Sequence, residues 1–408
     1  MKTRRRAVTS LNLPAPTRRT PTVRKIKSAI VPAVQRYPAG FGRTASSSAT
    51  PAGAAAAASA APDSGGAGSA AAAAPVSDGT QSSVGDAVGV VDLSVPIGRG
   101  LTLPNPILVA SGTFGYGVEY GDIVDVNRLG GICCKGTTLR PRIGNPTPRV
   151  AETPGGMLNS IGLQNPGVDA VLAKYSETWA GWTVPVIVNV AGESVADYVE
   201  VVRRMDGMPG IAGIELNISC PHVGKGGLQF AIDADAAASV TAAVRRVTDL
   251  PLMVKLSPNV ADVRAIARAI ADAGADALTA INTLSGIAVG PSRDRPFLGN
   301  TYGGLSGPAL KPVALRVVYE VSQVVDIPVI AIGGITDLAD VLDFLAVGAV
   351  AVQVGTAIFA DPTLPVRLID ELAGTCRSRG LDSYRPLIGT ALPRRASPPS
   401  SKGVEYRP

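Results

Sequence analysis

Six short apolar segments of this chain each end in a polar or reactive side chain. In chain order these side chains are Ser111, Lys135, Asn189, Asn217 with Cys220, Lys255 and Asn282. Two lysines beside three asparagines can bind an anionic ligand that carries several carbonyl oxygens. The alternative is that the lysines extend past their strands into water. We favour the anionic ligand, because lysine in an apolar strand is costly to bury without a partner.

Cys220 is the candidate catalytic residue. It lies in the segment Asn-Ile-Ser-Cys-Pro-His (217–222), just before a glycine-rich stretch (223–228) that could act as a lid. A thiol in such a place can serve as nucleophile or general base, whereas Cys133, Cys134 and Cys376 are interpreted as packing residues or have no evident role. The chain has no CxxC pair, so we expect it to hold no metal or iron–sulfur cluster.

Paired glycines mark a second feature of the same region. Gly333-Gly334 and Gly355-Thr356 close the seventh and eighth apolar segments. In α/β barrels the loops after strands seven and eight bind phosphate through backbone N–H groups. No GxGxxG sequence follows a strand, so the pattern favours a phosphorylated cofactor over a nicotinamide site of the Rossmann type.

Eight nearly continuous apolar segments are the elements that must position these groups. Continuous apolar strands are typical of a parallel sheet that is covered on both faces. Proline opens three of the segments, where its missing N–H does not interrupt a ladder. The segments are 106–110, 131–135, 184–190, 211–219, 250–257, 277–283, 327–333 and 349–355.

The helices between these strands repeat one pattern. An apolar stripe runs along 260–273 to Gly274, and another along 338–345 to Gly348, and both glycines are followed by Ala and the next strand. Eight such units predict the α/β class and a closed (β/α)8 TIM barrel. The segment 91–106 is expected to form a hairpin on the barrel floor, and the insertions Gly136–Asn165 and Leu284–Pro308 to build an active site at the C-terminal face.

The two ends of the chain differ from its body. Residues 1–62 hold eleven Lys and Arg and no Asp or Glu, and an Ala/Ser/Gly-rich stretch follows. We therefore expect a disordered extension over 1–89, a folded barrel over 90–392 and a disordered tail over 393–408. The extension also has the composition of a transit peptide, although its alanine-rich part fits a low-complexity extension better.

Charge and hydropathy narrow the class of protein. Without the eleven basic residues of the extension, 27 basic residues face 32 acidic ones, which disfavours a nucleic-acid partner. No apolar run is long enough to span a membrane, so we expect no membrane partner. Four cysteines without a pairing pattern suit a reducing cytoplasm.

From residue 91 to residue 372 the sequence resembles the dihydroorotate dehydrogenase family, a family of FMN enzymes of pyrimidine biosynthesis. The order and spacing of many short motifs carry the resemblance. They are ASGTFGYG (110–117), the Lys135 segment, NPTPRVAETPGGMLNSIGLQNPG (145–167), ELNISCP (215–221), VKLSPN (254–259), INTLSG (281–286), TYGGLSGPALKP (301–312), IGGI (332–335) and QVGTAIF (353–359).

The resemblance implies one FMN per chain across the barrel mouth. It places the flavin ring and its neighbours against Ala110, Ser111, Gly112, Lys135, Gly136, Asn189, Asn217, Lys255 and Ile281, and the phosphate against Gly307, Gly333, Gly334, Gly355 and Thr356. Lys255 beside the ring would stabilise the negative charge that the ring gains on reduction.

The resemblance also implies a substrate site and a base. Dihydroorotate would contact Lys135, Asn159, Ser160, Ile161, Gly162, Leu163, Asn217, Asn282 and Thr283. Cys220 would remove the C5 proton while hydride leaves C6 for the flavin, giving orotate. A cysteine base places the chain in class I of the family, since class II members have serine there.

The segments 141–153 and 223–230 resemble the NAD-linked B-type branch. There the barrel is a homodimer within a heterotetramer, and a second subunit carrying FAD and [2Fe–2S] passes electrons to NAD+.

A fumarate-linked class I enzyme is the first alternative. His222 stands where the family usually has a substrate-contacting Asn, and Ser-Cys-Pro-His also occurs in dihydropyrimidine dehydrogenases, so an enzyme acting on uracil or thymine is the second. A flavin-free barrel with Cys220 as nucleophile and a basic-tailed binding protein are further rivals.

Overall fold

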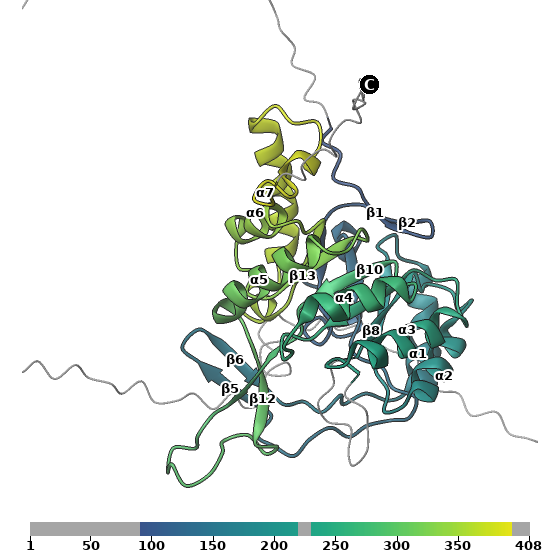
Figure 1. The fold of residues 1–408 in the computed structure, drawn as a ribbon, viewed down its shortest axis with the longest axis vertical. Coiled ribbons are helices and arrows are strands. Elements are labelled where there is room, and N and C mark those ends of the chain that lie inside the picture. Colours follow the sequence, from purple (N-terminus) through teal and green to yellow (C-terminus); the bar gives the residue numbers. More distant parts are fainter. Residues whose placement is uncertain (1–89, 219–229, 394–408) are drawn as a thin grey trace, which may run out of the picture.

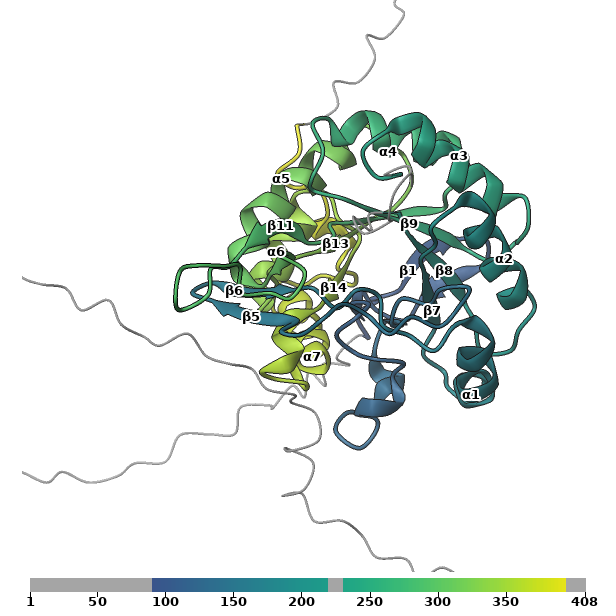
Figure 2. The same ribbon diagram turned by 90° about the horizontal axis from the view of Figure 1, so that it is seen from below.

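The structure is a computed structural model that describes residues 90–218 and 230–393. The predictions for the extension, for the glycine-rich stretch and for Cys220 and His222 concern residues outside these ranges. So does the prediction for the C-terminal tail, apart from Pro393. Within the described residues the chain forms a closed barrel of parallel strands with helices around it (Figures 1 and 2).

Each of the eight predicted apolar segments contains one barrel strand. Neighbouring strands pair in parallel and in chain order, and β14 closes the ring on β3. The strands are two to four residues shorter than the segments, because their ends turn out of the ladder. They are β3 (Ile107–Val109), β4 (Gly131–Cys133), β7 (Val186–Val190), β8 (Gly213–Asn217), β9 (Leu252–Leu256), β10 (Ala277–Ala280), β13 (Val329–Ile332) and β14 (Ala351–Val354). The predicted TIM barrel is confirmed.

Seven α-helices lie outside the barrel in the part of the chain that the structure describes (Figure 2). Their bounds are α1 (Val168–Ala180), α2 (Val195–Met205), α3 (Ala234–Arg245), α4 (Val263–Asp272), α5 (Lys311–Ser322), α6 (Leu338–Ala346) and α7 (Leu364–Ser378). The first repeat differs from the expected βα unit. Between β3 and β4 it has two 3-10 helices, η2 (Val118–Tyr120) and η3 (Val126–Arg128). Glycine is a poor helix former, and Gly112, Gly115 and Gly117 all have positive φ here.

Local sequence explains where the regular helices begin and end. Asp262 caps α4 by accepting a hydrogen bond from a backbone N–H of its first turn. Gly274 follows the end of α4 with φ +97°, and Gly348 follows α6 with φ +104°, as expected of C′ glycines. The Gly-Ala joints therefore reverse the chain into β10 and β14 at the N-terminal end of the barrel.

The N-terminal hairpin covers that end. Strands β1 (Val95–Gly98) and β2 (Leu101–Leu103) pair antiparallel. Nε of Arg99 in the turn donates to Asp276 Oδ1, 3.1 Å away, just before β10 begins. The hairpin therefore lies on the barrel floor, as predicted from the sequence. Figure 1 shows it at the opposite end of the barrel from strands β5, β6 and β12.

The two long insertions form one structure at the C-terminal end of the barrel. The insertion after β4 provides β5 (Val150–Thr153) and β6 (Gly156–Asn159), and the one after β10 provides β11 (Leu284–Ile287) and β12 (Tyr302–Ser306). They pair in the order β11-β12-β6-β5 through the contact of β12 with β6 (Figure 1). Ala151, Leu158 and Leu298 form a small separate core under this antiparallel sheet.

The main core fills the space between barrel and helices. Its largest fully buried side chains include Trp179, Tyr198 and Phe344, one from each of three helices. Burial of this apolar surface is the main force holding the helices on the barrel. Across the described residues, no helix combines the length and the apolar character needed to cross a membrane.

Candidate active site

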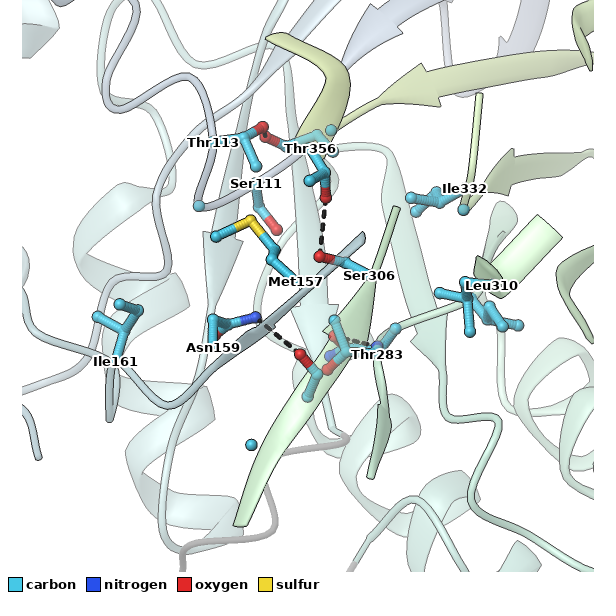
Figure 3. Close-up of a pocket in the computed structure, with 18 of the residues that line it drawn as sticks. Ser111, Thr113, Met157, Asn159, Ile161, Thr283, Ser306, Leu310, Ile332 and Thr356 are labelled. Atoms are coloured by element: carbon cyan, nitrogen blue, oxygen red, sulfur yellow. Dashed lines mark hydrogen bonds between the residues drawn. The ribbon is translucent and has the colours of Figure 1, made fainter. Parts of the chain in front are cut away.

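A cavity of about 560 Å³ opens between the C-terminal ends of the barrel strands and the antiparallel sheet (Figure 3). This volume lies within the range of cofactor and small-molecule sites. Side chains from all eight strand ends reach it, together with β6 and β12 from the insertions. The insertions therefore form the wall of the site that faces the barrel mouth.

The cavity brings together every predicted site residue that the structure describes. Those predicted for the cofactor are Ala110, Ser111, Gly112, Lys135, Gly136, Asn189, Asn217, Lys255, Ile281, Gly307, Gly333, Gly334, Gly355 and Thr356. Those predicted for the substrate alone are Asn159, Ser160, Ile161, Gly162, Leu163, Asn282 and Thr283. Cys220, three residues after the last residue of β8 in the sequence, lies outside the described residues. That these residues line one cavity agrees with the roles expected of them. The roles themselves stay predictions.

A buried carboxylate lies under this cavity. Glu215 of β8 is fully buried, and Asn189 Nδ2 and Gln353 Nε2 donate to its two oxygens at 2.6 and 3.0 Å. Lys255 Nζ lies 3.8 Å from Glu215 Oε1 and 3.3 Å from Ser111 Oγ. The network thus joins strands β7, β8, β9 and β14 across the barrel.

The carboxylate of Glu215 is ionised in this setting. Burial by itself raises the pKa of a carboxyl group, but the Lys255 ammonium and the donated hydrogen bonds outweigh it and lower the pKa of Glu215. The sequence interpretation gave Lys255 an anionic ligand as its partner. The structure shows that the chain provides a partner of its own, so Lys255 is paired before any ligand binds.

Asparagines form the polar side of the cavity. Asn282 Nδ2 donates to Asn217 Oδ1 at 3.2 Å, which joins the ends of β8 and β10. The Tyr198 hydroxyl donates to the Asn217 backbone carbonyl at 2.8 Å and holds that strand end in place. Asn159 Nδ2 donates to the Gly304 carbonyl at 3.4 Å across the β6–β12 pair. Amide groups held in this way can present fixed donors and acceptors to a planar polar ligand.

Lys135 lies two residues beyond β4, whereas the sequence placed it within the strand. Its backbone N–H donates to the Gly115 carbonyl at 2.8 Å. Desolvation lowers the pKa of its ammonium below the usual lysine value, although Glu119 acts in the opposite sense. No carboxylate pairs with Lys135 among the residues that the structure describes. A half-buried cation of this kind gains most from an anionic ligand.

The glycines after β13 and β14 form a cradle that fits a phosphorylated cofactor. Gly333 and Gly334 have φ values of +131° and +79°, and a Cβ on Gly334 would lie 2.7 Å from Lys311 Cβ. Only glycine therefore allows this backbone to face the cavity. Thr356 Oγ1 donates to Ser306 Oγ at 2.8 Å beside it (Figure 3). Exposed backbone N–H groups and hydroxyls suit a phosphate.

Sequence reasoning missed several residues of the site. Glu215 and Gln353 support it from below, and Ser257, Asn259, Tyr302 and Ser306 line it. Glu215 could have been found from the same signal as Lys255, since it is a charge in an apolar strand two residues before Asn217. Gln353 gave a weaker signal of the same kind. The residues of β12 lie within a motif and an insertion that the sequence analysis identified, but they were given no role, because their approach to the cavity depends on the pairing of two distant insertions.

Comparisons with known proteins agree with this architecture. The family model described as "Dihydroorotate dehydrogenase" matches residues 94–375. The chain is 50% identical over 298 residues to a protein of Geobacter sp. (strain M21) named "Dihydroorotate dehydrogenase B (NAD(+)), catalytic subunit", covering 73% of this chain and 97% of the relative. A protein of the same name from Anoxybacillus flavithermus is 53% identical over 290 residues, covering 71% and 93%.

A solved structure supports the fold alone. The crystal structure of a dihydroorotate dehydrogenase from Eimeria tenella in complex with ferulenol has a TM-score of 0.61 to this chain at 24% identity. The match covers 73% of this chain and 88% of the solved chain. The overall fold is thus shared with that solved structure.

Proposed function

The chain belongs to the dihydroorotate dehydrogenase family, and from that membership we propose that it oxidises (S)-dihydroorotate to orotate in pyrimidine biosynthesis. The observation that supports this most strongly is the convergence of Lys135, Asn217 and Asn282 on one cavity above the Lys255–Glu215 pair. The relatives named above are NAD-linked enzymes, which favours that branch over a fumarate-linked or uracil-reducing enzyme.

The proposed cofactor is FMN, one per chain. Gly307, Gly333, Gly334, Gly355 and Thr356 hold its phosphate, as their backbone cradle suggests. Ser111, Asn189 and Lys255, which line the cavity at the ends of the barrel strands, face its flavin ring. When bound, FMN supplies the hydride acceptor for C6 of dihydroorotate.

The protein groups orient the substrate and accept its proton. The ammonium of Lys135 binds the substrate carboxylate, and the amides of Asn159, Asn217 and Asn282 bind the ring carbonyls and N–H groups. Cys220 takes the C5 proton as general base. Burial raises the pKa of the thiols of Cys133, Cys134 and Cys376, which keeps them protonated. The other three cysteines are therefore poor candidates for the base. This supports Cys220, which follows Asn217 by three residues in the sequence.

We expect Lys135→Met to weaken orotate binding by about 10- to 150-fold, since a hydrogen bond to a charged group contributes about 1.5–3 kcal/mol. The flavin should stay bound. Titration of the oxidised, flavin-loaded protein with orotate, followed by the change in flavin absorbance, measures the effect. The matched control is Lys174→Met on the exposed face of α1, which should bind orotate as the unaltered chain does. Equal affinity of both variants would remove Lys135 from the substrate site.

The electrons go on to NAD+ through a second subunit that carries FAD and a [2Fe–2S] cluster. The relatives' name, "catalytic subunit", supports such a partner. We propose a homodimer of this chain within a heterotetramer, with the barrel of residues 90–392 as the FMN-binding unit and residues 1–89 and 393–408 as disordered ends. The unpaired cysteines at 133, 134 and 376 suit the reducing conditions of a cytoplasmic enzyme.

The substrate assignment is tested by anaerobic reduction of the bound flavin. The purified chain should be yellow, and dihydroorotate should bleach it within seconds, whereas dihydrouracil, which lacks the carboxylate that Lys135 binds, should leave it oxidised. The absorbance of the flavin is the readout. Bleaching by dihydrouracil alone would instead favour a dihydropyrimidine enzyme, and a colourless protein that takes up no FMN would exclude a flavoenzyme.

A further inference from the structure

We propose that Glu215 is a positioning residue that fixes the ammonium of Lys255 under the flavin ring and lowers the reduction potential of the flavin. The inference rests on the proposed function, because it requires the flavin to lie in this cavity. It concerns a residue that does not line the cavity and therefore cannot touch the ligand itself.

The geometry connects Glu215 to the cavity through two side chains that do line it. Asn189 Nδ2 donates to Glu215 Oε1 at 2.6 Å, and Lys255 Nζ lies 3.8 Å from the same oxygen. Strand register places these groups together, since Asn189 pairs with Glu215 and Lys255 with Asn217 along neighbouring ladders. The carboxylate therefore contacts both of the side chains that are expected to meet the flavin.

The burial of this network argues against a purely structural role. Glu215 is 0% exposed and Lys255 is 5% exposed, so both charges are held away from water. A buried ion pair gains little over a well-packed apolar pair, because desolvation offsets the attraction. An apolar pair would hold these two strands together at least as well. What the ion pair adds is a fixed charge of each sign just below a cofactor site.

The two charges act on the flavin in opposite directions. The flavin gains negative charge on two-electron reduction, so the Lys255 ammonium favours the reduced form and the Glu215 carboxylate disfavours it. With both present the floor of the site is close to neutral. Removing either charge alone should shift the potential, and removing both should restore it approximately.

The test is the midpoint potential of the flavin bound to the full chain, measured by anaerobic dye reduction. We expect Glu215→Gln to favour the reduced flavin at least tenfold, a rise of about 30 mV for a two-electron couple. Lys255→Met should shift the equilibrium tenfold in the opposite direction. The double variant should lie within about threefold of the unaltered protein, which a merely structural role for Glu215 would not produce.

Thr279→Val is the matched control. Thr279 pairs with Lys255 in the β9–β10 ladder and is fully buried, and its hydroxyl has no hydrogen-bond partner among the described residues. The exchange removes a barrel hydroxyl but no charge, so the potential should not change. A Thr279→Val shift as large as that of Glu215→Gln would show that the potential responds to any barrel substitution, and would overturn the inference.

A potential that stays constant or falls in Glu215→Gln would also overturn it. Should that variant fail to fold, the comparison moves to Lys255→Met with and without Glu215→Gln, where loss of the carboxylate should still favour the reduced flavin about tenfold. Equal potentials of that pair would refute the role of Glu215. Dye reduction needs no substrate, so a chain whose flavin dihydroorotate cannot reduce would refute the proposed function while these potentials remain measurable.

Discussion

Replacing Cys220 with alanine should leave FMN bound and slow its reduction by dihydroorotate by about 10²- to 10⁴-fold. General base catalysis contributes a factor of this size, and Cys220 is the residue proposed for that role. Anaerobic stopped-flow measurement of flavin bleaching gives the rate. Because the thiolate is the active form, the rate of the unaltered chain should rise towards alkaline pH, where an ordinary thiol with a pKa of about 8.5 loses its proton, and then level off.

Cys376→Ala is the control for this experiment. Cys376 is buried on α7, and burial raises the pKa of its thiol, so the substitution removes a cysteine that has no access to substrate. Its rate of flavin reduction should match that of the unaltered chain. If Cys220→Ala reduced its flavin at a rate within threefold of normal, the proton would have to leave to another group and the assignment of the base would be wrong.

Gly334→Val should lower the affinity for FMN by about 100-fold. The residue has φ +79°, a conformation that costs a residue with a side chain about 1–2 kcal/mol. Its Cβ would also lie 2.7 Å from Lys311 Cβ and 2.8 Å from the Lys311 backbone nitrogen, so the loop must shift from the position proposed to bind the phosphate. Fluorescence titration of the flavin-free protein with FMN measures the affinity.

Gly100→Val separates the effect of backbone strain from that of the steric clash with Lys311. Gly100 has the same φ of +79°, but it lies in the turn between β1 and β2, and a Cβ there meets nothing within 4 Å. We expect a similar loss of stability and an unchanged affinity for FMN. If both variants lost FMN equally, backbone strain alone would explain the loss, and the phosphate cradle would have to lie elsewhere.

The sequence by itself determined the strands and most of the side chains at their ends. Continuous apolar runs and the Gly274-Ala275 and Gly348-Ala349 joints identified the barrel, because side-chain sterics and glycine at positive φ act over a few residues. The same local argument placed Asn189 and Lys255 at the ends of two predicted strands. Motif order then connected those residues to a family, and the family to a flavin site.

Only the tertiary structure decided how distant segments meet. It paired β6 with β12, so that Asn159 and Gly304 form one wall of the site although 145 residues separate them. It also joined Glu215 to Gln353 across the barrel, 138 residues apart, and so gave Lys255 a partner within the chain. Such contacts depend on closure of the ring and on the pairing of its insertions, which bring together side chains whose local sequences carry no information about each other.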